Sequence, residues 1–332
     1  MADLLPAVWF VLVGFFFAVY TILDGFDLGI GVLFPVLGRT YAEKGSLIRM
    51  LGPLWDGNEV WILGGAVALF GAFPDVYATV FSGFYLALML VLLGLILRAV
   101  TFELWSAESP RRAFWDATFV LGSLLPALLL PVALGNVVAG VPLGADKEYA
   151  GDFLTLLRPF PLVLGLFGLL VILNQGASFA AAKTTGTVQA RARRLREILH
   201  LALVPGLLVV GGLTVLEVPA IAERPIAWAA ITAAAALWIV AEYSARRGAD
   251  ARAFVLSSLM VVALWAVVGA YQFPNLVTAS NDPALSLTIT NASSGESTLM
   301  TMLVVAIIGM PPVLAYTWYA YRVFKGPVPA AS

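Results

Sequence analysis

The amino-acid sequence predicts an all-α polytopic membrane protein that forms a single integral membrane domain over residues 1–332. Of its residues 61% are hydrophobic and 12% are charged, about half the charged fraction of an ordinary soluble domain. The mean hydropathy is +0.94. These polar side chains are too few to cover the exterior of a water-soluble protein of this size. Much of the apolar surface must therefore face lipid. Helices are expected rather than strands, because a β-barrel would show short alternating segments instead of long apolar runs.

Nine stretches without Asp, Glu, Lys or Arg mark the expected transmembrane helices. Most reach the roughly 20 residues that a helix needs to cross a hydrocarbon core of about 30 Å. The second stretch is short, and it spans the membrane only if residues 51–59 are also inside. We expect the first helix to end near Leu33, before Pro35. The nine stretches are 4–23, 60–74, 76–97, 117–145, 159–182, 198–216, 225–241, 253–281 and 297–321.

The distribution of Lys and Arg predicts the orientation. Between nine spans, 16 of these residues fall in alternate loops that we place in the cytoplasm, and only 3 fall on the other side. The split follows the positive-inside rule and places the N-terminus outside and the C-terminus in the cytoplasm. The basic loop 183–196 is expected to face anionic lipid. The three outside residues are Lys147, Arg158 and Arg224.

Two long external segments, 138–157 and 272–297, separate some of these spans. The second is rich in Ser, Thr and Asn and contains no Lys or Arg, and we expect an ordered or semi-ordered cap. No segment resembles a soluble domain. The function is therefore expected to lie within the membrane or with a partner chain.

Two pairs of acidic residues lie within or beside the first two spans. Asp24 and Asp27 are three residues apart and share a helix face, as do Asp56 and Glu59. At 1.5 Å per residue, Asp24 would lie about 14 Å above the inner end of its helix, and the second pair roughly 9 to 14 Å above theirs. Both pairs are therefore expected at a similar depth in the cytoplasmic half of the membrane.

Polar groups at this depth are costly and need a reason. A carboxylate at mid-helix costs about 2.5 to 3.5 kcal/mol on insertion scales. Asn174 and Gln175 on the fifth span are expected at a similar level, so three helices would offer polar groups in one layer. The layer predicts either a proton relay or ion site, or a structural hydrogen-bond cluster that locks the helices together. Arg98 either reaches toward the inner interface or acts as counter-charge to a buried acid.

Composition limits the chemistry that this chain can perform alone. It contains no cysteine, which excludes disulfides, iron–sulfur clusters and c-type haem attachment. Its single histidine, His200, cannot supply a bis-His haem site, and we expect no metal site and no haem ligand in the chain. With a net charge of −1 it offers no basic surface for nucleic acid.

Several motifs resemble subunit II of cytochrome bd-type quinol oxidases, including their cyanide-insensitive relatives. The segment DGFDLG at 24–29 resembles the family's DGFDxG element, and PLWDGNEVW at 53–61 resembles its PxWDGNxVW element. The other matching segments follow in the same order at similar spacing: FSGFY at 81–85, RAVTFE at 98–103, GNVVAGVP at 135–142 and QGA at 175–177. The resemblance covers almost the whole chain. It is weakest from about 184 to 297, where few motifs are recognisable.

The resemblance implies a subunit of a terminal oxidase that oxidises quinol and reduces dioxygen to water, in a bacterial or archaeal cytoplasmic (inner) membrane. Haems b and d, or haem b only, would be ligated by the larger subunit I. The nine helices would form two four-helix bundles plus one peripheral helix. The expected partners are subunit I, membrane lipids, the quinol pool and a small single-helix subunit.

The resemblance also implies site residues. Some relatives hold a quinone in this subunit, for which Trp55 is the expected contact here. The other residues would support a proton path from the cytoplasm along the subunit interface. They are Asp24, Asp27 and Asp56, with Glu59, Arg98 and Glu103 as neighbours.

Two other classes of function remain open from the residues alone. A proton-coupled secondary transporter would use an intramembrane acidic site, although its site is often built from two matching halves of the chain, and here the acidic layer lies only in the first half. A purely structural membrane scaffold would use the same polar groups as hydrogen-bonding contacts between helices. Co-purification with a haem-bearing subunit separates the oxidase from both.

Overall fold

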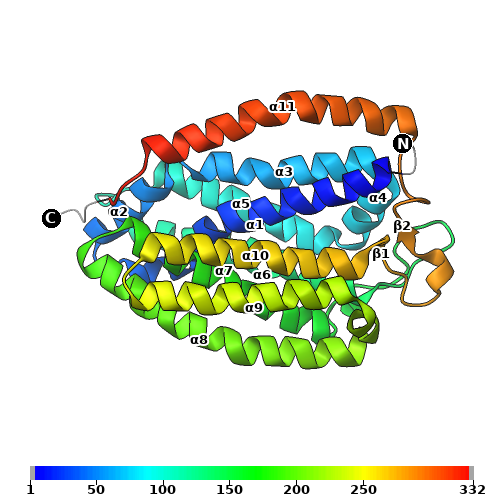
Figure 1. Ribbon diagram of the computed structural model, residues 1–332. Helices are drawn as coiled ribbons and strands as arrows, with labels where there is room; N and C mark the ends of the chain where they lie inside the picture. Colours follow the sequence, from blue (N-terminus) through cyan, green and yellow to red (C-terminus); the bar gives the residue numbers. More distant parts are fainter. Residues whose placement is uncertain (1–3, 329–332) are drawn as a thin grey trace.

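A computed structural model describes residues 4–328, and the described part of the chain is built from long α-helices (Figure 1). Short 3₁₀ segments (η1 Leu154–Leu156, η2 Pro219–Glu223, η3 Pro283–Leu285) and two short strands (β1 Asn275–Val277, β2 Leu287–Thr288) lie in the connections. The α-helices are α1 Leu5–Leu37, α2 Tyr41–Leu51, α3 Trp55–Ala72, α4 Pro74–Gly83, α5 Tyr85–Leu104, α6 Arg112–Ala139, α7 Pro159–Lys183, α8 Gly186–Glu217, α9 Pro225–Arg246, α10 Asp250–Gln272 and α11 Glu296–Val323.

The prediction of an all-α membrane protein is confirmed. Among the described residues, 8 helices are long and apolar enough to cross a membrane: α1 and α5 to α11. Helix α3 has 18 residues and is more polar, because its first turns carry Asp56, Asn58 and Glu59. It begins at Trp55, so the acidic pair belongs to the same helix as the short apolar stretch 60–74.

Two predicted boundaries are wrong. Helix α1 does not end near Leu33 but continues through Pro35 to Leu37. A proline this close to a helix end removes only one backbone hydrogen bond, so the last turn is retained. Asp24 is therefore about 20 Å from the inner end of its helix rather than 14 Å. The stretch 76–97 is not one helix, since it is divided between α4 and α5 at Phe84.

Helix α1 is the central element of the described fold. It packs against α3, α6, α7 and α10. Every residue from Asp24 to Gly31 is buried, so this part of α1 is covered on all sides. Close approach of α7 explains two glycines, because a Cβ on Gly29 would lie 2.2 Å from the Ile172 carbonyl oxygen and one on Gly176 would lie 2.5 Å from the Gly29 carbonyl carbon.

Helices α8, α9 and α10 pack beside this centre, whereas α11 is peripheral. The α9–α10 and α7–α8 pairs make extensive contacts, and α10 also packs on α7 and α1. Helix α11 runs along one outer side, over α3 (Figure 1), and Leu299 is its one buried residue. The outer end of α11 is tied to α1 by a hydrogen bond from Trp9 Nε1 to the Leu299 carbonyl oxygen, 3.1 Å long.

The two ends of the molecule differ in structure. The described chain starts at one end and finishes at the other, near α2 and the α7–α8 and α9–α10 turns (Figure 1). At the starting end, β1 and β2 form an antiparallel pair, and Val141 pairs with Ala279. The external segments expected as a cap are thus ordered against each other.

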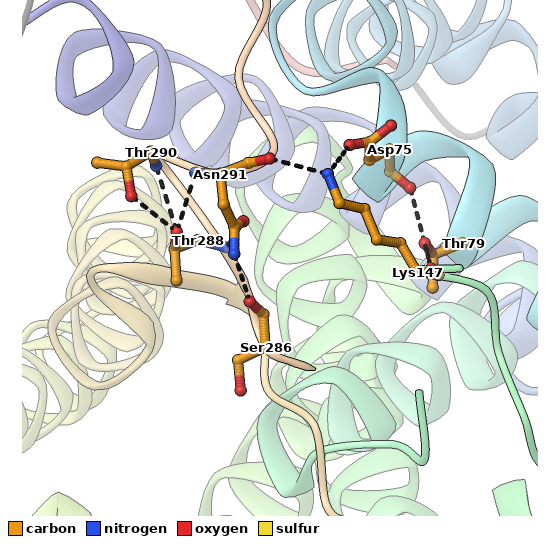
Figure 2. A network of polar contacts seen from close by, with 7 residues as sticks. All are labelled: Asp75, Thr79, Lys147, Ser286, Thr288, Thr290 and Asn291. Carbon is orange, nitrogen blue, oxygen red and sulfur yellow. Dashed lines mark hydrogen bonds and ion pairs between the residues drawn. The ribbon is translucent and has the colours of Figure 1, made fainter. Parts of the chain in front are cut away.

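Figure 2 shows the polar contacts that join this cap to α4. Lys147 Nζ lies 2.6 Å from Asp75 Oδ2 and donates to the Asn291 carbonyl oxygen at 3.0 Å, while Thr79 Oγ1 donates to the Lys147 carbonyl oxygen at 2.6 Å. Asn291 in turn donates to the Ser286 carbonyl oxygen at 2.9 Å. The Lys147–Asp75 pair is about two-fifths exposed on each side, so its contribution to stability is expected to be about 0 to 1 kcal/mol.

Candidate functional site

A fully buried arginine joins three helices in the first half of the chain. Arg98, on α5, has no exposed surface, and its Nη2 lies 2.5 Å from Asp24 Oδ1 on α1 and 2.8 Å from Glu59 Oε2 on α3. Of the two interpretations left open for Arg98, the structure therefore supports a counter-charge to buried acids. Asp24 has no exposed surface either, whereas the Glu59 side chain is 22% exposed.

Asp27 lies on the same buried face of α1 but has different partners. Asn58 Nδ2 donates to Asp27 Oδ2 at 2.8 Å and to the Leu23 carbonyl oxygen at 3.3 Å. The Tyr321 hydroxyl on α11 donates to Asn58 Oδ1 at 2.9 Å. Sequence reasoning missed the roles of Asn58 and Tyr321, although Asn58 stands inside the WDGN motif and Tyr321 closes the last uncharged stretch.

Buried polar atoms remain in this cluster that accept or donate no hydrogen bond within the described protein. They include Arg98 Nε and Nη1, Asp24 Oδ2 and Asp27 Oδ1. Tyr20, one helical turn from Asp24 on α1, is also buried and interacts with Asp24. Donors and acceptors that have no protein partner can bind water or exchange protons.

Three predicted residues lie outside this buried cluster. Asp56 and Glu103 are exposed on the surface of the chain, on α3 and α5. Asp56 is still close enough to act electrostatically on Glu59. Trp55 is partly buried and stacks on Phe102, with ring centroids 4.9 Å apart and planes 9° apart.

The amide pair on α7 lies near the level of the acids, since the neighbouring Gly176 packs against Gly29 of α1, but Gln175 makes no hydrogen bond to an acid in the described structure. Gln175 is buried and bonds to α10 instead, donating through Nε2 to Ser258 Oγ at 3.0 Å and accepting from Ser257 Oγ. Asn174 is buried on the same helix. Depth along a helix was estimated correctly enough to place these amides in the interior, but depth does not determine which neighbour a side chain faces.

A second group of charges lies where α8 meets the end of α9 and the start of α10. Asp250 is buried and pairs with Arg193 at 2.5 Å and with Arg196 at 2.9 Å. His200 stacks on Trp238, with centroids 4.6 Å apart, and its Nε2 lies 3.7 Å from a carboxylate oxygen of Glu242. No acid of this group is connected to the Arg98 cluster by a hydrogen bond or ion pair in the described structure.

The chain's own residues do not fit a haem. A histidine that ligates haem presents a free ring nitrogen to the iron, but the His200 ring is covered on one face by Trp238 and its Nε2 faces Glu242. Within residues 4–328, no group of three or more His, Asp or Glu side chains has the arrangement of a metal site.

Glu43 on α2 joins helices at the end of the molecule where the described chain finishes (Figure 1). Burial raises the pKa of its carboxyl, but hydrogen bonds from Thr187, Arg191 and the backbone of Thr40 and Arg39 outweigh this and lower it to about 2. The Thr187 hydroxyl donates to Glu43 Oε1 at 2.7 Å, and the Glu43 backbone N–H donates to the Thr40 hydroxyl in a capping box. Glu43 thus connects α2 to the start of α8 and is ionised at neutral pH.

These features define a class of protein: a multi-pass α-helical membrane protein that buries an arginine–carboxylate cluster. Comparison with known proteins makes the class specific. The family model for cytochrome bd terminal oxidase subunit II matches residues 5–324. The chain belongs to this family, and it is a multi-pass subunit of an oxidase of the bacterial respiratory membrane.

Relatives match over nearly their whole length. The chain is 33% identical to cytochrome bd-I ubiquinol oxidase subunit 2 of Escherichia coli K12, over 96% of this chain and 94% of that one. It is 31% identical to cytochrome bd ubiquinol oxidase subunit 2 of Bacillus subtilis, over 96% and 95%. A chain in the solved structure of bd oxidase from Geobacillus thermodenitrificans has a TM-score of 0.82, with 18% identity, covering 96% of this chain and 98% of that one. The last comparison confirms the fold of a bd oxidase chain.

Proposed function

We propose that this subunit supports a haem-bearing subunit I and supplies part of a proton path from the cytoplasm to the site where dioxygen is reduced. The proposal is supported most by one observation: Arg98 is fully buried between a fully buried Asp24 and a Glu59 that reaches the surface. Glu59, Arg98 and Asp24 form a continuous line of charged groups from the exterior of the chain into its core. The electrons would come from a quinol, as the names of the relatives state for theirs.

Energetics favour a functional reason for the cluster. Replacing a buried ion pair by apolar side chains is often neutral or stabilising, so such a pair is weak support for stability as its purpose. Intramembrane ionisable groups typically mark ion or proton pathways. A cluster that serves only to lock helices together would use all of its hydrogen-bond donors and acceptors. Arg98 and Asp27 instead keep atoms without a hydrogen-bond partner in the described protein.

The residues act by holding and passing protons. Reducing dioxygen to water consumes protons, and haems bound in subunit I would supply the electron transfer and the oxygen chemistry. Asp56 on the surface would collect protons near Glu59, and Asp24 would accept them inside. Arg98, which stays positively charged, would keep the neighbouring carboxylates able to ionise in the membrane. If quinol releases its own protons outside, charge is separated without a pump.

The same face of the chain is proposed to contact subunit I. Asp56 and Glu103 lie exposed among apolar side chains of α3 and α5, including Val60, Leu63 and Leu104. Exposed acids among apolar groups at membrane depth are costly in lipid but acceptable where a partner or water covers them. A subunit I that covers this face would place the acids in the interface, where protons could cross to it. A quinone contact at Trp55 stays a prediction, and Phe102 already covers one face of that ring.

The topology proposed from the sequence is compatible with the arrangement of the termini. With α3 as the ninth span, an odd number of crossings puts the two ends of the chain on opposite sides, as they lie in Figure 1. The N-terminus would be outside and the C-terminus cytoplasmic, with α1 to α10 in two bundles and α11 at the periphery. The whole chain would act as one membrane domain.

Purification through a tag on this chain tests the proposed function. The oxidase requires a co-purifying larger subunit and reduced-minus-oxidised haem bands, and the chain expressed alone should be colourless. A colourless preparation that has no partner and takes up a substrate would instead favour a proton-coupled transporter. The proton-path part is tested by Asp24→Asn and Asp56→Asn in the intact complex.

A further inference from the structure

A second hydrogen-bonded arm leads away from Asp27, toward the last helix. It runs from the Tyr321 hydroxyl to Asn58 Oδ1 over 2.9 Å, and from Asn58 Nδ2 to Asp27 Oδ2 over 2.8 Å. Asn58 is 2% exposed and Asp27 is 0% exposed, so both ends of this amide contact lie in the interior. The proton path proposed through Glu59 and Arg98 does not use this arm.

The amide of Asn58 can face its two partners in two ways. While the Tyr321 hydroxyl donates to Oδ1, the NH₂ group faces Asp27 and donates to its carboxylate. If the amide turned over, Oδ1 would face the carboxyl group of Asp27, and only a protonated carboxyl could then donate to it. The orientation that Tyr321 supports is therefore the one that favours the ionised form of Asp27.

The amide also determines the direction of proton movement. A carboxamide does not pass a proton from one side to the other without leaving its stable neutral form. Asn58 consequently blocks proton transfer between Tyr321 and Asp27, although hydrogen bonds connect the three residues. Protons would reach Asp27 from the side of Asp24 and Arg98.

We propose that Tyr321 is a positioning residue: through Asn58 it keeps an N–H donor on Asp27 and so sets how readily that carboxyl takes up a proton. The proposal rests on the proton path proposed above. Leu299 is the one buried residue of helix α11, so few side chains of this helix reach the core. The Tyr321 hydroxyl reaches it through the hydrogen bond to Asn58, and the position of α11 can therefore affect Asn58.

Titratable and charged groups act on Asp27 from its own helix and from three neighbouring helices. They are Asp24 on its own helix, Glu59 on α3, Arg98 on α5 and Tyr321 on α11. Tyr321→Phe leaves the first three in place and removes only the hydroxyl. Tyr319→Phe is the matched control, because Tyr319 lies on the same helix and is 60% exposed.

The experiment uses the complete oxidase and three readouts: haem content, oxygen consumption as a function of pH, and the infrared carboxyl band of Asp27, assigned with Asp27→Asn. In Tyr321→Phe we expect normal haem content, about tenfold slower turnover at neutral pH and a profile displaced to higher pH, because the Asn58 amide is no longer held with its N–H donor on the Asp27 carboxylate. The infrared band should move in Tyr321→Phe and stay unchanged in Tyr319→Phe. An unmoved band and an unchanged profile in an assembled Tyr321→Phe oxidase would overturn the proposal.

A second variant keeps the test decisive. Asn58→Ser should displace the profile in the same direction, and the double variant Asn58→Ser/Tyr321→Phe should displace it no further, because both changes remove one donor. Additive displacements would contradict the proposed connection. If Asp27→Asn left turnover unchanged, the proton path would fail for this residue, while a band moved by Tyr321→Phe alone would still show that Tyr321 positions Asp27.

Discussion

Replacing Asp24 by Asn should slow oxygen reduction as well as weaken the protein. Asp24 has no exposed surface, and its Oδ1 lies 2.5 Å from Arg98 Nη2. The amide preserves the shape of the side chain but removes its charge and its ability to bind a proton. Arg98 then retains Glu59, at 2.8 Å, as its carboxylate partner within the described structure.

The two effects are measured by different assays. Removing one partner of a buried ion pair costs about 3 to 5 kcal/mol, and we expect about 3 kcal/mol here because Glu59 remains. A positioned proton-transfer group contributes about 10² to 10⁴ in rate, so oxygen consumption per haem should fall by about 100-fold or more. The assays are thermal unfolding of the purified complex and oxygen consumption normalised to haem.

Asp250→Asn provides the matched control. Asp250 is also buried and pairs with two arginines, Arg193 and Arg196, but it lies on α10, outside the Arg98 cluster. It should destabilise the complex by a comparable amount and leave turnover per haem unchanged. If Asp24→Asn gave the same pattern as Asp250→Asn, the cluster would be a structural lock and the reasoning about the proton path would be refuted.

The other predictions concern the entrance, the core packing and the inner surface. Asp56→Asn should slow oxygen consumption with haem content intact, and unchanged turnover would remove Asp56 from the path. Its effect and that of Asp24→Asn should not multiply in the double variant, since both residues would lie on one route; independent rate effects would contradict this. Gly176→Leu should prevent recovery of the assembled complex, because even a Cβ there would lie 2.5 Å from the Gly29 carbonyl carbon, and a normal yield would show that α1 and α7 can separate. The pKa of Glu43 is lowered from 4.5 to about 2, so its ionised carboxylate stabilises the fold above pH 4.5, and that contribution is lost as the pH falls toward 2. In Glu43→Gln, the unfolding temperature should therefore depend less on pH between 4.5 and 2. An unaltered dependence would argue against the hydrogen-bonded role of Glu43.

Much of the fold could be predicted because lipid imposes a simple rule on the sequence. Uncharged stretches indicated the long helices, and the spacing of three placed Asp24 and Asp27 on one buried face. The boundaries at Pro35 and Phe84 could not be predicted from composition. A proline near a helix end is tolerated, and a break within an apolar stretch leaves hydropathy unchanged.

The site could be predicted only as far as single helices determine it. Helix geometry gives the angle between two residues of one helix, but not how neighbouring helices are rotated against each other. For this reason Arg98 had two open interpretations, the contact of Gln175 with α10 was not predicted, and Asp56 was not recognised as exposed. The contact between Tyr321 and Asn58 joins residues 263 positions apart, which no local pattern indicates.

Proton uptake measured during a single turnover would test the central claim most directly. The reduced oxidase would be reconstituted in vesicles and mixed with dioxygen, with a pH indicator on the side of the C-terminus and the haem absorbance followed in parallel. Asp24→Asn should slow the indicator signal by about 100-fold or more while the first haem absorbance change keeps its rate. An indicator signal at the wild-type rate in an assembled Asp24→Asn oxidase would show that protons reach the oxygen site by another route.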